Sequence, residues 1–143
     1  VSWPARMQRL KTGPLVEAAE RAELWLDGGH NPAAGRAMAY LIKTLPNRST
    51  HLICGMLNTK DIDGYLAPLA EVAQSLTAVD IPNEINTLPA QTTADAAQRV
   101  GFQSEIAPNV QSAIENITAS EPDARILICE SHYLAGDVLR SNS

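Results

Sequence analysis

Aromatic residues are scarce in this chain, which has one phenylalanine, two tryptophans and three tyrosines among 143 residues. Proteins that bind single-stranded nucleic acid stack the bases on aromatic side chains, and this chain offers few of them. Basic runs are missing too, and the formal net charge is −5. No apolar run approaches the ~20 residues of a membrane-spanning helix, and we expect no signal peptide. We therefore expect neither nucleic acid nor a membrane as a partner.

Cysteine is also rare, and Cys54 and Cys129 each end an apolar strand pattern. Two cysteines cannot close a zinc site without histidines, and the three histidines show no metal-ligand spacing. We therefore expect no metal site in this chain. The prediction for the cysteines is two buried free thiols in a protein of the reducing cytoplasm. A disulfide between them and a catalytic thiol are the alternatives.

Two glycine-rich nucleotide motifs are absent, G-x-x-x-x-G-K-[ST] and G-x-G-x-x-G. The chain therefore lacks a complete ATP-hydrolysing or dinucleotide-dependent site, and any nucleotide site in it is half a site. The length suits a single domain over residues 1–143. The chain begins at Val1, and residues 1–10 read as an element entered in the middle of a protein, so we expect it to be part of a longer one.

Strand and helix patterns alternate along the chain. Strands are predicted at residues 5–10, 23–26, 50–56, 75–81, 102–106 and 124–129, and helical spacing at 34–45, 62–73, 93–100, 110–117 and 134–139. Asp61 is a predicted N-cap, Thr92 or Thr93 another, and Pro68 implies a kink or a break. Residues 15–22 are ambiguous, and extension of the preceding strand region through Leu15 and Val16 is one interpretation.

This alternation predicts an α/β fold, a three-layer α/β/α Rossmann-like domain with a mostly parallel (mixed) sheet of about six strands. Ligands of such sheets bind beyond the carboxyl ends of the strands. Three loops follow predicted strand ends and should meet at that edge. They are residues 27–32, 55–61 and 130–136.

The loop over residues 27–32, Asp-Gly-Gly-His-Asn-Pro, is the most informative of the three. Gly28 and Gly29 let the backbone turn tightly and approach a ligand closely. Asn31 can cap the following helix, and Pro32 suits the first helical turn. The start of that helix offers free N–H groups and a positive dipole end, which favour an anion. The loop therefore has the features of a nucleotide-binding edge.

Four further side chains suit the same edge, each with a second interpretation. Asp27 offers a carboxylate to hydroxyl groups and His30 an imidazole, although alone they could be a turn former and a surface histidine. Lys60, just before a predicted helix, could meet a phosphate or a carboxylate, or be a solvated lysine. Arg6 could reach a phosphate with its planar fork of donors, or be a surface charge.

Four segments match, in order, the motifs of one known family. Residues 3–8 resemble W-P-G-R-x-E, residues 26–32 resemble L-D-G-A-H-N-P, residues 55–61 resemble G-M-L-x-x-K-D, and residues 128–138 resemble G-S-x-Y-x-x-G-E-V. These are motifs of the C-terminal domain of folylpolyglutamate synthase and dihydrofolate synthase, in the Mur ligase superfamily. The resemblance spans nearly the whole chain, and its second motif is the most specific.

The resemblance implies a two-domain ATP-dependent ligase. In this family a larger N-terminal domain carries the phosphate loop, the Mg²⁺ ligands and most of the dihydropteroate or folate site. ATP phosphorylates the substrate carboxylate, and the amine of L-glutamate attacks the acyl phosphate. Carried over, Asp27 would bind the ATP ribose and Arg6 the phosphates. His30 would line the same pocket, and Lys60 is a weaker candidate for the incoming glutamate. No catalytic residue is expected in this domain alone.

Two alternatives remain open. The first is the C-terminal domain of a Mur-type ligase that acts on peptidoglycan precursors, although Gly55-Met56-Leu57 favours a folate ligase. The second is a standalone nucleotide-binding α/β module. A receiver-type module would need acidic residues around a phosphorylatable aspartate, and Asp27 lacks such neighbours. The residues that select dihydropteroate or folyl-polyglutamate are expected on the missing domain.

Overall fold

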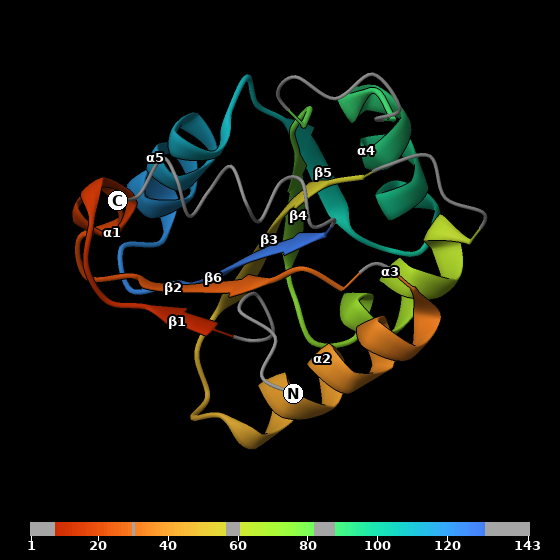
Figure 1. Cartoon of the computed structure of the whole chain (residues 1–143), viewed down its shortest axis with the longest axis horizontal. Helices are drawn as coiled ribbons and strands as arrows, with labels where there is room; N and C mark the ends of the chain where they lie inside the picture. Colours follow the sequence, from red (N-terminus) through yellow and green to blue (C-terminus); the bar gives the residue numbers. More distant parts are fainter. Residues whose placement is uncertain (1–7, 30, 57–60, 82–87, 131–143) are drawn as a thin grey trace.

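The computed structural model describes residues 8–29, 31–56, 61–81 and 88–130 (Figure 1). Strands and helices alternate along them, as the sequence predicts. The elements are β1 (Gln8–Leu10), α1 (Pro14–Ala19), β2 (Glu23–Asp27), α2 (Pro32–Thr44), β3 (Thr50–Gly55), α3 (Ile62–Ala70), β4 (Ser75–Ala78), α4 (Ala90–Arg99), β5 (Gln103–Ile106), α5 (Val110–Ser120) and β6 (Arg125–Glu130).

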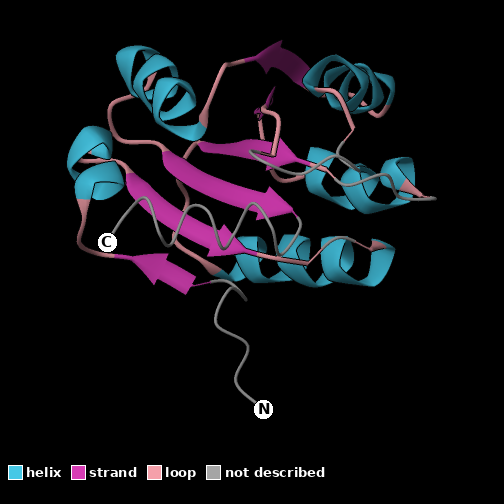
Figure 2. Cartoon of the chain, turned by 45° about the horizontal axis from the view of Figure 1, so that its top comes forward, coloured by secondary structure: helices cyan, strands magenta, loops and turns pink. Residues whose placement is uncertain are grey.

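The strands form one six-stranded sheet in the order β1-β2-β6-β3-β4-β5. Strand β1 runs antiparallel to β2, and the other neighbouring pairs are parallel. Helices α2, α3 and α4 cover one face, and α1 and α5 cover the other (Figure 2). The predicted three-layer domain with a mixed, mostly parallel sheet is thus confirmed.

The core consists of two apolar layers, one on each face of the sheet. Strand side chains alternate between them, so Ile126 and Ile128 pack with α1 and α5, while Leu127 and Cys129 pack with α2, α3 and α4. A central parallel strand is apolar on both faces for this reason. Both cysteines are buried and free, which confirms the prediction of free thiols and rules out the disulfide.

Side-chain caps define where the helices begin. Asn31 Oδ1 accepts a hydrogen bond from Ala34 N–H at 2.8 Å, and Asp61 Oδ1 accepts one from Gly64 N–H at 2.8 Å. Both predicted caps are confirmed, and Pro32 occupies the first position of α2. Pro68 lies inside helix α3, which continues to Ala70, so the helix does not break at the proline itself.

The structure resolves the ambiguous segment and corrects one predicted helix start. Leu15 and Val16 are helical, because Pro14 starts the short helix α1. This helix buries Leu15 and Ala19, one turn apart, against α5.

Helix α4 begins at Ala90 rather than after Thr92 or Thr93. Asp80, from the loop after β4, accepts a hydrogen bond from the Ala90 N–H at 2.9 Å, and Thr93 is buried in the helix instead.

The predicted helix 134–139 lies outside the described residues. Within the described part of the chain, the longest helix has 13 residues, and none qualifies as a membrane span.

Candidate functional site at the carboxyl edge of the sheet

Three strand ends lie side by side at the carboxyl edge. In the register of the sheet Asp27 of β2 is opposite Cys129 of β6, and Gly55 of β3 is opposite Glu130 of β6. The loops that follow β2, β6 and β3 therefore start as neighbours, although in sequence they are far apart. This confirms that the three predicted loops leave the sheet together, while residues 57–60 and 131–136 lie outside the described ones.

Asp27 is held within the turn that it begins. Its side chain is only 2% exposed, and Oδ1 accepts a hydrogen bond from the Gly29 N–H at 2.8 Å. This bond fixes the orientation of the carboxylate. The interpretation of Asp27 as a turn former is therefore correct. It is also compatible with ligand binding, because the turn fixes the direction of the carboxylate.

Gly29 is needed for space rather than for an unusual backbone conformation. It does not adopt a positive φ. A Cβ atom added to it would lie 2.6 Å from Ala34 Cβ and 3.2 Å from Asp27 Oδ1. The backbone at Gly29 therefore approaches the first turn of α2 closely. The neighbouring Gly28 is buried.

Helices α2 and α3 touch through their first turns. A Cβ added to Gly35 would clash with the backbone carbonyl oxygen of Tyr65, so the two backbones are in direct contact. The capped N-termini of the two helices, at Asn31 and Asp61, consequently lie near each other. Two positive dipole ends at one sheet edge favour an anionic ligand, while the Asp61 carboxylate offsets part of that field.

The structure brings together Asp27, Gly28, Gly29 and Asn31 among the predicted site residues. The other three, Arg6, His30 and Lys60, lie outside the described residues. Within the described ranges no group of three or more His, Cys, Asp or Glu side chains could hold a metal ion.

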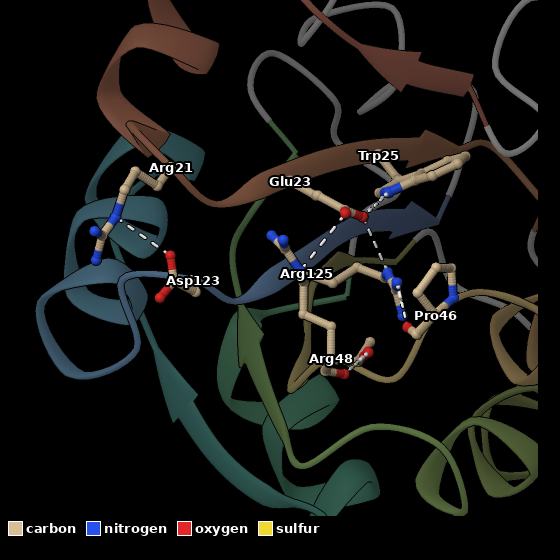
Figure 3. Close-up of polar contacts among 8 residues, drawn as sticks. Arg21, Glu23, Trp25, Pro46, Arg48, Asp123 and Arg125 are labelled. Atoms are coloured by element: carbon tan, nitrogen blue, oxygen red, sulfur yellow. Dashed lines mark hydrogen bonds and ion pairs between the residues drawn. The ribbon is translucent and has the colours of Figure 1, made fainter.

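The amino edge of the sheet carries a polar network that sequence reasoning missed (Figure 3). Arg125, only 2% exposed, donates from Nε to Glu23 Oε1 at 3.1 Å and from Nη2 to the Pro46 carbonyl at 2.7 Å. Glu23 also accepts from Trp25 Nε1 at 3.1 Å and pairs with Arg48 Nε at 3.5 Å. The only available signal was an arginine at the start of an apolar strand.

The pKa of the Glu23 carboxyl reflects this network. Burial alone would raise its pKa, but hydrogen bonds from Trp25 and Arg125 and the positive charges of Arg125 and Arg48 hold the pKa below the ordinary value. The carboxylate therefore stays ionised. Its role is to satisfy the buried guanidinium, which would otherwise be an unpaired charge inside the protein.

A second polar chain lies beside it. His51, which is 8% exposed, has Nδ1 2.6 Å from Ser75 Oγ and Nε2 3.0 Å from Ser49 Oγ, and Ser49 Oγ donates to Gln74 Oε1 at 2.8 Å. Burial lowers the pKa of His51, partly opposed by the charge of Glu121. Two hollows of about 240 and 510 Å³ open nearby, both lined by residues of this edge, and neither touches Asp27.

The fold and the family match together identify a domain of the α/β ligase class. Residues 5–132 match the family described as "Mur ligase, glutamate ligase domain", and the chain belongs to that family.

Among curated proteins, the chain is 31% identical over 127 residues to a dihydrofolate synthase/folylpolyglutamate synthase of Mycobacterium tuberculosis, covering 87% of this chain and 24% of that protein. Among solved structures, the folylpolyglutamate synthase of M. tuberculosis complexed with ADP and AMPPCP has 25% identity and a TM-score of 0.72, covering 100% of this chain and 33% of that one. A folylpolyglutamate synthase/dihydrofolate synthase from Yersinia pestis, complexed with AMPPNP and a Mn ion, has 21% identity and a TM-score of 0.75, covering 98% and 31%.

The chain spans only part of the proteins that it resembles. It covers 34%, 15% and 24% of the lengths of three curated relatives, so the matched region corresponds to about a third or less of each.

Proposed function

We propose that this chain is the C-terminal domain of a two-domain, ATP-dependent folate ligase. The complete enzyme adds L-glutamate to dihydropteroate, to folyl-(poly)glutamate or to both, and this domain contributes one wall of the ATP site between the domains. The observation that carries the proposal is the carboxyl edge, where the Asp27 turn and the start of α2 adjoin the ends of β6 and β3. Membership of the glutamate ligase domain family supports it.

Asp27 and the start of α2 take separate parts of the nucleotide. The Asp27 carboxylate, oriented by the Gly29 N–H, accepts hydrogen bonds from the ribose hydroxyls. The N-terminus of α2, capped by Asn31, favours the negative phosphates. In the same proposal Arg6 contacts the phosphates, His30 lines the pocket and Lys60 receives the carboxylate of the incoming glutamate. Their roles rest on the motifs quoted above.

The described residues fit a nucleotide but not a metal ion. The carboxyl edge offers one buried carboxylate and two helix N-termini, whereas no cluster of metal ligands occurs in the described part of the chain. We therefore place the Mg²⁺ ligands and the phosphate loop on an N-terminal ATPase domain, the main partner of this one. ATP, when bound, supplies the phosphoryl group that activates the substrate carboxylate. Closure of the two domains would exclude water from the activated acid.

The proposal makes the isolated chain a folded but inactive domain of a cytoplasmic enzyme, in keeping with the free thiols of Cys54 and Cys129. Half a site binds ATP weakly, because the other half of the phosphate contacts is missing. Positioning and charge stabilisation, which supply most of the rate in such transfers, need both domains.

Incorporation of labelled L-glutamate tests the proposal. The full-length protein that carries this chain is assayed with ATP and, in parallel, with dihydropteroate and a folyl-glutamate. A UDP-muramyl precursor is offered separately, together with each labelled amino acid of the peptidoglycan stem peptide. We expect ATP-dependent ligation to one or both pterin substrates and none by residues 1–143 alone. Ligation only to the UDP-muramyl precursor would favour the peptidoglycan alternative. Tight ATP binding by the isolated chain would favour the standalone module. Ligation by the isolated chain would contradict the proposal that it holds only half of the ATP site.

A further inference from the structure

Gly29 is the one position of the Asp27 turn where this chain departs from the family motif, which has alanine there. The structure has no room for that alanine. Its Cβ would lie 2.6 Å from Ala34 Cβ, well inside the 3.5–4.0 Å at which carbon atoms pack favourably. The same atom would lie 3.2 Å from Asp27 Oδ1, so the methyl group would also press on the carboxylate.

Both groups that an added methyl group would meet, Asp27 and Ala34, are held in place by other contacts. On one side, the Asp27 carboxylate is tied to the Gly29 N–H. On the other, the Ala34 N–H is held by Asn31 Oδ1 at 2.8 Å, and the next residue, Gly35, lies directly against the backbone of Tyr65 in α3. The first turn of α2 is thus fixed between the Asp27 turn and α3.

The methyl group of Ala34 occupies the space that an alanine at position 29 would use. If Ala34 became glycine, the nearest remaining atom of that residue would be its Cα, 3.9 Å from a Cβ at position 29, which is ordinary contact. Only the Asp27 Oδ1 contact would stay slightly short. One methyl group therefore fits between the turn and the helix, on either residue but not on both.

We propose that Gly29 and Ala34 are a reciprocal pair of positioning residues, which together set the place of the Asp27 carboxylate relative to the N-terminus of α2. The functional part of this inference rests on the proposed function, since it concerns the nucleotide that both features would hold. A methyl group on each residue at once pushes the carboxylate and the helix start apart. Exchanging the methyl group between the two residues keeps their spacing.

A four-variant cycle tests the pair: the unchanged chain, G29A, A34G and the double variant G29A/A34G. Affinity for ADP is measured in the full-length protein, and urea unfolding in residues 1–143. Neighbouring residues that share a contact couple by factors of about 2 to 150. We expect G29A to weaken ADP binding about tenfold, A34G to change it less than about threefold, and the double variant to bind within about threefold of the unchanged protein.

Ala39→Gly is the matched control for A34G, since Ala39 is also buried in α2 but lies away from the turn. It should lower the urea midpoint as A34G does, through helix propensity, and should not rescue G29A. If G29A alone fails to fold, the folding and ADP affinity of the double variant still decide the matter.

Each result points one way. Rescue of both stability and ADP affinity in the double variant supports the pair as positioning residues. If the double variant regains stability but still binds ADP weakly, the positioning role is wrong and the two residues share only a packing contact. If the effects of G29A and A34G are additive in the double variant, the two residues are not coupled and the proposal is wrong. If the unchanged full-length protein does not bind ADP, the proposed function fails and the functional inference fails with it, while the unfolding cycle still reports on the packing.

Discussion

The two edges of the sheet hold their polar side chains in different ways. At the amino edge, Arg125 and Glu23 satisfy each other and are closed in by Pro46 and Trp25. At the carboxyl edge, the backbone N–H of Gly29 orients Asp27 within its own turn, and helices α2 and α3 begin nearby. The first arrangement uses charge to hold strands and loops together. The second leaves oriented groups where loops from three strands converge.

This difference separates stability from function. A change at the amino edge should alter the free energy of unfolding and leave ligand binding in the folded protein intact. Neutralising the Asp27 carboxylate without changing its shape should do the reverse.

Arg125→Ala should cause the largest loss. It removes a buried guanidinium that donates to both the Glu23 carboxylate and the Pro46 carbonyl. Breaking a buried ion pair from one side costs about 3 kcal/mol or more. Urea unfolding should show this loss, whereas Arg21→Ala, which breaks an ion pair to Asp123 whose side chains are 71% and 70% exposed, should cost at most about 1 kcal/mol. Equal losses would show that the amino edge is not the stabilising one.

Gly35→Ala should come next and should act against the usual rule. In most helices this change adds about 1 kcal/mol of stability. Here the new methyl group would meet the Tyr65 carbonyl, and overpacking of this kind costs about 1–3 kcal/mol. We expect a net loss of about 1 kcal/mol in urea unfolding. Ala37→Gly, at an exposed site of α2, calibrates the propensity effect, and a gain of stability in Gly35→Ala would refute the close helix contact.

His51 should give the smallest effect, visible as a pH dependence. Burial lowers the pKa of His51 in the folded protein, so the unfolded chain binds the proton first as the pH falls. Stability is therefore full above the unfolded pKa of about 6.5 and declines as the pH falls through that value toward the folded pKa. Urea midpoints between pH 7.5 and 5.5 should fall in the unchanged chain and fall less in His51→Gln. Parallel profiles for the two proteins would exclude His51 as the cause.

Local features were predictable from the sequence, and features that join distant segments were not. The apolar run of β6, the Asn31 cap and the turn at Asp27 each depend on a few adjacent residues. The Arg125–Glu23 pair joins residues 102 positions apart, and no local pattern indicates it.

The same reason explains the ambiguity at α1 and the error at the start of α4. Helix α1 has only six residues, too few for helical spacing to stand out from a strand pattern. The start of α4 depends on Asp80, ten residues earlier in the chain, so local threonines were the wrong guide. At the site, the tight contacts of Gly29 and Gly35 are properties of packing, which sequence patterns do not record.

The affinity of the full-length protein for ADP, compared in Asp27→Asn and Arg125→Ala, tests the account most directly. Asparagine keeps the oxygen that accepts the Gly29 N–H, so the turn survives, but it loses the charge proposed to hold the ribose hydroxyls. We predict a loss of affinity of about tenfold or more in Asp27→Asn, with little change in unfolding, since hydrogen bonds to charged groups contribute about 1.5–3 kcal/mol. Arg125→Ala should lose stability and keep its affinity. Unchanged ADP binding in Asp27→Asn would contradict the account.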